Sequence, residues 1–356
     1  MRQWKLLTLL LIMVVALLSA GCGGGKQADT APKSAPAAAS PEADLVAKAK
    51  AEGKVVLYAG GHTREGVERI AKAFQDKYGI PVEYTRKGTG EVVKMVEAEK
   101  GANAIRVDMI SVADPTIVMA WAKKDVLAVC KTPNWDNIID SVKDKDGYWS
   151  TYSITMLGVM YNTAKIKNPP QSWEEIFDPK YKVVHASPSY SGTAASFMNA
   201  IANSSEGWAF YEKLSKNKPI VVQSSLALPQ MLLAGEADLG IPGIESQVED
   251  AKKAGQPVGL IYPKNNQPTL MSPIAVIKDA PHPNAARLLF NFHLSPEGQK
   301  LLCESGGRSV LKNDAPSSPG LKSMSELKPI YTNYPDLEAN KKAQFSKFEQ
   351  IMGASR

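Results

Sequence analysis

The sequence lacks the short motifs that identify common hydrolases, zinc proteins and nucleotide-binding proteins. It contains no Gly-x-Ser-x-Gly, no His-Glu-x-x-His and no Cys-x-x-Cys. The stretch GGHTREGV continues with Glu68 instead of the Lys and Ser/Thr of a P-loop, and GTGEVV lacks the third glycine of a dinucleotide-binding turn. Because these motifs are missing, we expect neither an enzyme nor a bound cofactor.

Cysteine is scarce, with three residues in a chain of 356. One of them, Cys22, directly follows the N-terminal apolar segment. The other two are Cys130 and Cys303, and in an exported protein such a pair forms either a disulfide or two buried thiols. The sequence fits both alternatives.

A strongly basic surface is also missing. The formal net charge is +6, but Lys and Arg are interleaved with Asp and Glu along the expected helices. This pattern is typical of solvated helix faces and differs from the basic stripe that binds nucleic acid. We therefore expect no nucleic-acid partner.

The one long apolar run lies at the N-terminus, where a basic start precedes apolar residues 6–18 and small residues follow. A permanent membrane-spanning helix would need roughly 20 apolar residues, so this run indicates an export signal instead. The string LSAGC resembles the lipobox of bacterial lipoproteins, whose signal is cut before the cysteine that receives lipid. This resemblance implies a signal peptide over residues 1–21 and a lipid on Cys22, which would hold the chain at a membrane surface. An ordinary signal peptide cut near Ala20 is the alternative.

Residues 22–44 are rich in Gly, Ala, Pro and Ser and contain no large apolar residue. Such a segment cannot bury a core, so we expect a disordered tether after the lipidated cysteine. As a random coil it would span roughly 25 Å. The ordered part is expected from about Leu45 onward, and its length suits two lobes.

From Val55 onward, short apolar strands alternate with amphipathic helices, which predicts parallel sheets covered by helices. Two extended stretches, residues 147–162 and 269–278, do not fit helices and are expected to cross between two such series. We predict an α/β fold with two lobes, each a mostly parallel sheet flanked by helices, joined by crossing hinge strands. The expected boundaries are 45–153 plus 270–312 for the first lobe and 154–269 plus 313–356 for the second.

Ligands of open parallel sheets bind at the carboxyl ends of the strands, where helix N-termini present free N–H groups. The loops at these positions supply the candidate ligand contacts, which are Gly61, His62, Thr63, Lys87, Thr89, Asp114, Ser189, Ser191, Gly192, Thr193, Ser225 and Glu245. The stretch SPSYSGTAASF is the most informative, because hydroxyls and backbone donors at a helix start suit an oxyanion. Plain helix capping is the alternative for its serines and for Asp114, and simple solvation is the alternative for Lys87.

Several stretches resemble the solute-binding lipoproteins of ABC importers, more specifically the group that binds ferric ion, thiamine and phosphonates. They are LYAGGHTREGVERIAKAFQDKYGIPVEY, PQSWEEIFDPKYK, LLAGEADLG and HPNAARLLFNFHLSPEGQKLL, and the resemblance covers nearly all of residues 54–313. It implies a type II periplasmic-binding-protein fold whose two lobes close on a solute by a hinge motion and then dock on a permease.

His62 falls at the position where the ferric-binding members of this group carry a histidine ligand. Those members also use a glutamate and two adjacent tyrosines, where this chain has Ala113 and the pair Glu245 and Ser246. Fe(III) prefers several anionic oxygens, so a metal site of His62 and Glu245 is an alternative and not the main expectation.

The anion pocket of the group is matched by Ser191, Gly192 and Thr193, which suits a phosphate, phosphonate or carboxylate. Asp114 stands where the group has a neutral amide, and its carboxylate would favour a zwitterion such as an aminoalkylphosphonate. We therefore expect a monomeric, lipid-anchored receptor outside the cytoplasm, which delivers a small anionic or zwitterionic solute to an ABC permease. A ferric-ion receptor is the first alternative, and an enzyme or sensory lipoprotein on the same scaffold is the second.

Overall fold

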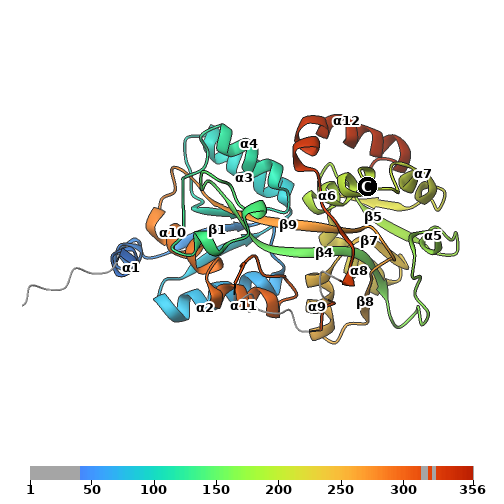
Figure 1. Cartoon of the computed structure of the whole chain (residues 1–356), viewed down its shortest axis with the longest axis horizontal. Helices are drawn as coiled ribbons and strands as arrows, with labels where there is room; N and C mark the ends of the chain where they lie inside the picture. Colours follow the sequence, from blue (N-terminus) through green and yellow to red (C-terminus); the bar gives the residue numbers. More distant parts are fainter. Residues whose placement is uncertain (1–40, 314–319, 323–325, 356) are drawn as a thin grey trace, which may run out of the picture. The chain divides into compact units, whose positions relative to one another are not determined.

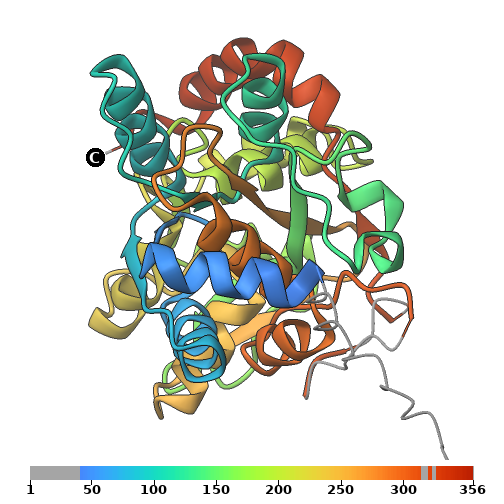
Figure 2. The ribbon, with the colours of Figure 1, turned by 90° about the vertical axis from the view of Figure 1, so that its left-hand side faces the viewer.

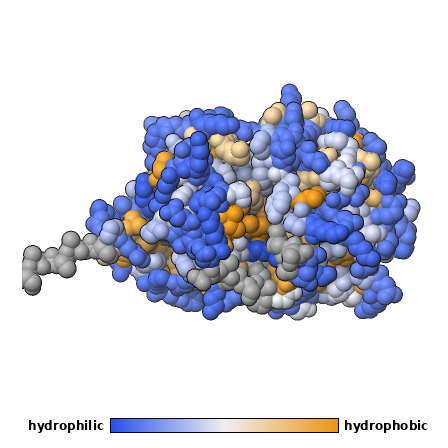
Figure 3. Space-filling view, viewed as in Figure 1, coloured by the Kyte–Doolittle hydropathy of each residue, from blue (hydrophilic) through white to orange (hydrophobic). Residues whose placement is uncertain are grey.

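The computed structural model describes residues 41–313, 320–322 and 326–355. The expected signal peptide, Cys22 and most of the expected tether lie outside these residues. Among the helices in the described ranges, none combines the length and the apolar character that a membrane span needs. Hydrophilic residues cover most of the face shown in Figure 3.

The first described helix, α1 (Pro41–Glu52), begins four residues before Leu45, within the last residues of the expected tether. Leu45 and Ala49 pack against the adjacent core, and this tertiary contact orders a segment whose composition is polar. The Glu52 carboxylate accepts hydrogen bonds from the backbone N–H of Asn284 and of Ala285, at 3.1 and 2.8 Å. These groups lie in the first turn of α10 (Pro283–His293), against which α1 packs (Figures 1 and 2).

The strands form one continuous mixed sheet in the order β2-β1-β3-β9-β4-β7-β5-β6, with β10 paired to β9 and β8 paired to β4. Their bounds are β1 Val55–Ala59, β2 Val82–Arg86, β3 Met109–Ser111, β4 Ser150–Asn162, β5 Val183–Ala186, β6 Ile220–Val222, β7 Leu239–Ile244, β8 Val258–Ile261, β9 Gln267–Val276 and β10 Pro329–Ile330. Pairing is parallel among β1, β2 and β3 and among β5, β6 and β7. The predicted parallel sheets are therefore confirmed.

The long strands β4 and β9 run antiparallel to each other and connect the two parallel groups (Figure 1). The residues of β9 from Ile274 to Val276 pair with β3, whereas β4 from Leu157 onward pairs with β7 and β8. The predicted crossing strands are thus confirmed, and they join two lobes. The residue boundaries predicted for the lobes stay a prediction.

Helices cover both faces of each parallel group, as alternating strand and helix patterns require. Around β1 to β3 lie α1, α2 (Arg64–Tyr78), α3 (Thr89–Gly101), α4 (Pro115–Lys123), α10 and α11 (Pro296–Glu304). Around β5 to β8 lie α5 (Trp173–Ile176), α6 (Gly192–Ala202), α7 (Ala209–Ser215), α8 (Leu228–Ala234), α9 (Glu245–Lys253) and α12 (Tyr334–Met352). Short 3-10 turns occupy Trp135–Asn137, Asp140–Val142 and Ser225–Ala227.

Each lobe has its own apolar core. In the first lobe, Val67, Ile70 and Phe74 of α2 are fully buried at the helical spacing that the sequence shows. In the second lobe, Phe348 of α12 is fully buried in another cluster. Burial of one such side chain contributes about 1.5 to 3 kcal/mol.

The two remaining cysteines are buried thiols and not a disulfide. Cys130 and Cys303 are both buried, and no disulfide joins them. Burial raises the pKa of the Cys130 thiol to about 12, so this thiol stays protonated.

Candidate functional site

Four helices begin at one cavity between the lobes. Their N-cap residues, Thr63 of α2, Gly88 of α3, Ser191 of α6 and Ile244 of α9, all line the cavity. Each helix N-terminus carries a positive partial charge of about half an elementary charge, together with N–H groups that have no partner inside the helix. The cavity is therefore surrounded by positive ends of dipoles from both lobes, and it encloses about 60 Å³.

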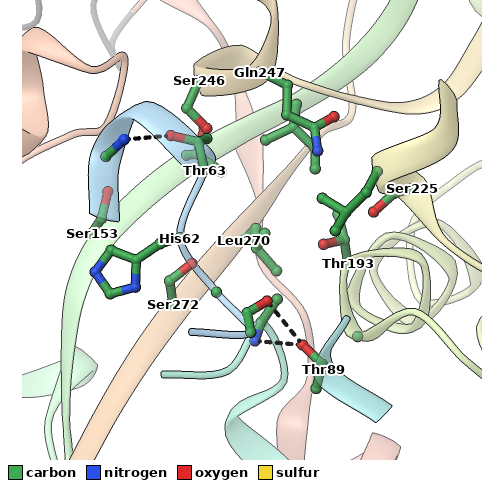
Figure 4. Close-up of a pocket in the computed structure, with 18 of the residues that line it drawn as sticks. His62, Thr63, Thr89, Ser153, Thr193, Ser225, Ser246, Gln247, Leu270 and Ser272 are labelled. Atoms are coloured by element: carbon green, nitrogen blue, oxygen red, sulfur yellow. Dashed lines mark hydrogen bonds between the residues drawn. The ribbon is translucent and has the colours of Figure 1, made fainter. Parts of the chain in front are cut away.

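Hydroxyl groups supply most of the polar lining. Figure 4 shows Thr63 and Ser246 above, Thr193 and Ser225 on one side and Ser272 on the other side of the same space. The hydroxyl-bearing side chains are Thr63, Thr89, Tyr152, Ser153, Thr155, Tyr190, Ser191, Thr193, Ser224, Ser225, Ser246, Ser272 and Ser305. Since a hydroxyl both donates and accepts, this lining can bind oxyanions and alcohol groups alike.

The start of α6 holds two backbone donors without an acceptor in the described part of the chain. Ser191 caps the helix by accepting from the Ala194 N–H, and it donates to the Ser225 hydroxyl at 3.2 Å. The N–H groups of Gly192 and Thr193 have no acceptor among the described residues. Both residues are buried, and a buried N–H without a partner is unfavourable unless a ligand or water accepts its hydrogen bond.

Arg86, at the end of β2, is the one charged side chain that lines this cavity within the described residues. Its Nε donates to the backbone carbonyl of His62 at 3.0 Å, and the rest of the guanidinium has no hydrogen-bond acceptor among the described residues. Burial and the nearby Arg64 lower the pKa of Arg86, yet an arginine remains charged at neutral pH. No Asp or Glu from the described residues lines the cavity beside it.

The imidazole of His62 is fixed by protein partners on both ring nitrogens. Nδ1 of His293 lies 2.8 Å from the Leu289 carbonyl oxygen, which only accepts, so this Nδ1 carries the proton. The Nε2 of His293 must then accept from Nε2 of His62 across 3.1 Å. It follows that Nδ1 of His62 accepts from the Ser111 hydroxyl at 2.7 Å.

Both imidazoles are neutral in this arrangement. Burial lowers the pKa of His62 well below its usual range, with contributions from His293 and Arg86, and burial lowers the pKa of His293 to about 4. The His62 ring also stacks on Tyr152, with ring centroids 4.2 Å apart. His62 therefore holds the first binding loop in place and has no free lone pair for a metal.

The structure does not bring His62 and Glu245 together as a metal site, which the ferric alternative required. Glu245 is fully buried, and its carboxylate pairs with Arg308, whose Nη2 lies 2.6 Å from Oε1. It also accepts from the Tyr262 hydroxyl at 2.5 Å and from the Met156 N–H at 2.9 Å. Within the described part of the chain, no group of three or more His, Cys, Asp or Glu could hold a metal ion.

Asp114 is a helix cap and not a cavity residue. Its carboxylate accepts from the Thr116 N–H at 3.0 Å and from the Thr116 hydroxyl at 2.6 Å, at the start of α4. The ammonium of Lys341 in α12 lies 2.7 Å from its other oxygen. The carboxylate that would have bound a solute amine is thus occupied by a protein cation.

Two further predicted contacts lie away from the cavity. Lys87 is exposed and its ammonium lies 3.7 Å from Glu91. Ser189 donates to Glu349 at 2.7 Å. The structure does bring together the other predicted residues, which are Gly61, His62, Thr63, Thr89, Ser191, Gly192, Thr193 and Ser225.

The sequence interpretation missed Arg86, Gln247 and the hydroxyls of the crossing strands. Arg86 is the last residue of an expected strand, and the carboxyl end of that strand was a signal that could have identified it. Ser153, Thr155 and Ser272 belong to β4 and β9, whose side chains reach the cavity because these strands cross between the lobes.

Comparison with known proteins agrees with the fold. The family of bacterial extracellular solute-binding proteins matches residues 69–338. An uncharacterised protein of Haemophilus influenzae is 27% identical over 321 residues, covering 85% of this chain and 91% of that protein. A Salmonella typhimurium protein provisionally named a 2-aminoethylphosphonate-binding periplasmic protein is 25% identical over 296 residues, covering 78% of this chain and 85% of that protein.

Solved structures show the same architecture. The periplasmic binding protein AfuA of Actinobacillus pleuropneumoniae, with fructose-6-phosphate bound, matches with a TM-score of 0.74 and 24% identity, covering 85% of this chain and 99% of AfuA. Iron-bound HitA of Pseudomonas aeruginosa matches with a TM-score of 0.68 and 25% identity, covering 84% and 99%. The chain therefore belongs to the bacterial extracellular solute-binding proteins, with the type II periplasmic-binding-protein fold of ABC-importer receptors.

Proposed function

We propose that this protein captures a small organic anion with a phosphate or phosphonate group between its lobes and delivers it to an ABC permease. The observation that carries the proposal is the start of α6. There the unsatisfied N–H groups of Gly192 and Thr193 lie beside the hydroxyls of Ser191 and Ser225. A tetrahedral oxyanion accepts several such donors at once, and the dipole of an eleven-residue helix favours its negative charge.

The charges around the cavity support an anion over a zwitterion. Arg86 contributes a positive charge, whereas the carboxylates of Asp114 and Glu245 are occupied by Lys341 and Arg308. A solute ammonium would lose its hydration in the cavity without gaining a carboxylate partner among the described residues. This feature favours a solute without an amine, unlike the one in the name of the Salmonella relative.

The proposal includes the lipid anchor at Cys22, which would keep the receptor close to its permease. We expect the Cys22→Ser variant to leave the membrane fraction and to appear in the soluble extracytoplasmic fraction. If the variant and the unaltered chain fractionate alike, the anchor is not at this cysteine.

The solute proposal is tested by a thermal-shift screen of the chain from Gly23 onward, after unfolding and refolding to remove bound ligand. The panel contains inorganic phosphate, alkylphosphonates, sugar phosphates, aminoalkylphosphonates, carboxylates, and ferric ion with carbonate. A ligand at a hundred times its dissociation constant adds about 2.7 kcal/mol, which moves the midpoint by several degrees. We expect shifts with phosphonates or phosphate esters and none with ferric ion.

A pair of serine variants shows where the ligand binds. Ser191→Ala removes a hydroxyl that lines the cavity, and we expect weaker binding by about 1.5 to 3 kcal/mol if the hydroxyl contacts the charged group. Ser189→Ala is the matched control, because this serine is exposed and donates to Glu349 instead. Equal affinities of the two variants, or a shift with ferric ion alone, would contradict the proposal.

A further inference from the structure

A side cavity of about 250 Å³ opens beside the first one, and its lining suggests a second contact for the solute. The two cavities share Thr63, Arg86, Leu226 and Gln247. The side cavity lies between α2 and the end of β2 in the first lobe and α8 and α9 in the second. A solute held at the start of α6 could therefore extend toward it without leaving the space between the lobes.

Two guanidinium groups line the side cavity, and within the described residues neither forms an ion pair or hydrogen bond with a carboxylate. Arg64, the first residue of α2, is exposed and forms no hydrogen bond or ion pair within the described residues. Arg86 is half-buried, and within the described ranges it donates only through Nε to a backbone carbonyl. By contrast, Arg69 and Arg308 each pair with carboxylates.

Two like charges this close are unfavourable, and the nearby Arg64 contributes to the lowered pKa of Arg86. An anion placed between them would remove the repulsion and would accept the N–H groups that Arg86 leaves unused. A guanidinium binds a carboxylate or phosphate through two parallel hydrogen bonds, so each arginine offers a geometry specific for an oxyanion.

One acidic residue, Asp250 of α9, also lines the side cavity, and its charge state bears on this site. The groups facing it are Thr63, Glu65 and Arg86 of the first lobe and Lys253 of its own helix. Burial and the neighbouring Glu65 raise the pKa of Asp250 to about 7. Below that pH the carboxyl is neutral and can donate a hydrogen bond to an oxyanion instead of repelling it.

We infer that the solute carries two oxyanionic groups, one bound at the start of α6 and a second one, of the carboxylate or phosphate type, bound by Arg86 and Arg64. This inference rests on the proposed function and adds the chemical class of the solute to it. It predicts a phosphonate or phosphate ester with an acid at its other end, and it assigns Arg64 to the site although that residue lies outside the first cavity.

The test uses pairs of phosphonates of equal chain length, measured by isothermal titration calorimetry on the refolded chain. Phosphonoacetate, 3-phosphonopropionate and 4-phosphonobutyrate are each compared with the alkylphosphonate that ends in methyl and with the aminoalkylphosphonate that ends in ammonium. For at least one length we expect the carboxylate to bind roughly ten to a hundred times more tightly than the methyl analogue. The ammonium analogue should bind more weakly than both.

Variants then locate the second contact. Arg64→Gln and Arg86→Gln should each bring the carboxylate-to-methyl affinity ratio toward one. If Arg86→Gln does not fold because the half-buried Arg86 is needed for folding, the exposed Arg64→Gln variant still tests the contact. Ser191→Ala should weaken both members of a pair equally and leave the ratio unchanged. Arg106→Gln is the matched control, since this exposed arginine lines a different cavity.

The possible results separate this inference from the function on which it rests. A carboxylate-to-methyl ratio near one at every length, with binding that still depends on Ser191, overturns the second contact and keeps the proposed function. A high ratio that neither arginine variant reduces also overturns it. Failure of every phosphonate and phosphate ester to bind overturns the proposed function itself.

Discussion

The Nε2 of His62 donates to the Nε2 of His293 across 3.1 Å, which connects the first binding loop to the buried helix α10. Both rings are at least nine-tenths buried, and each has its second nitrogen bonded to another protein group. The contact therefore fixes the loop that carries Gly61, His62 and Thr63 before any solute arrives. Preorganisation of this kind reduces the entropy that binding would otherwise lose.

The first prediction concerns this contact. His293→Leu leaves the Nε2–H of His62 buried without an acceptor, and a buried donor without a partner costs about 1 to 3 kcal/mol. We expect a loss of that size in the free energy of unfolding, measured by urea denaturation. Tyr331→Leu is the control, because this ring is exposed and lies away from the cavity. A loss below about 0.5 kcal/mol for His293→Leu would show that the contact is not needed.

The second prediction concerns pH. Burial lowers the pKa of His185 and of His293 to about 4, while an unfolded histidine titrates near 6.5. Between these values the unfolded chain binds more protons than the folded chain, so stability falls as the pH falls from 6.5 toward 4. Each buried histidine contributes a slope of about 1.4 kcal/mol per pH unit in this window.

His185→Phe tests the pH prediction. This ring already lies among Phe197, Tyr211 and Phe348, and its Nε2 has no hydrogen-bond partner among the described residues. The variant should lose about 1.4 kcal/mol per pH unit of the slope in urea denaturation across that range. An unchanged slope would mean that His185 is not the source of the effect.

The third prediction concerns the buried ion pair of Glu245 and Arg308. Arg308→Met leaves the fully buried carboxylate without its cation, which should cost about 3 to 5 kcal/mol. The double variant with Glu245→Gln should recover part of that loss, because no buried charge remains. Lys72→Met, which breaks an exposed pair with Asp76, is the control and should change stability by less than about 1 kcal/mol. Equal losses of stability in Arg308→Met and Lys72→Met would contradict the role of burial.

The fourth prediction concerns Lys341 and Asp114. Because α12 packs on α6 and α7 of the second lobe and on α4 of the first, this ion pair lies at a contact between the lobes. Lys341→Met removes this contact between the lobes and should therefore weaken solute binding. The order of affinities among anions should stay the same, since neither residue lines the cavity. Calorimetry with an alkylphosphonate and its amino analogue checks this. A gain for the amino analogue would show that the freed Asp114 carboxylate reaches the solute.

Local patterns predicted the elements and the anion-binding loop. Helical spacing of apolar residues predicted amphipathic helices, of which α2 is one, and Ser191 before Gly192 and Thr193 indicated a helix start, because capping depends on neighbours in the chain. These features need no knowledge of distant residues. The eight predicted residues that meet at the cavity all belong to such local signals at strand ends.

Distant pairing explains what the sequence could not show. Asp114 and Lys341 are 227 residues apart, and Glu245 and Arg308 are 63 apart, so nothing near either acid indicates that its charge is already neutralised. The strand end at Arg86 was visible in the sequence, but the contact of its Nε with the His62 carbonyl depends on β2 pairing with β1 and on the loop that follows β1. Sequence patterns indicate which side chains lie at strand ends, whereas tertiary contacts determine which of them stay available to a solute.

Gly192 marks how near the two lobes can come. A β-carbon placed on this residue would lie 2.9 Å from the β-carbon of Asp114 and 3.1 Å from the carbonyl oxygen of Ala113, both in the first lobe. Contacts that short are repulsive, so any larger side chain would act as a spacer between the lobes. We therefore expect Gly192→Ala to push the start of α6 away from residues 113–114, and so to widen the space between the lobes at the cavity by a few tenths of an ångström.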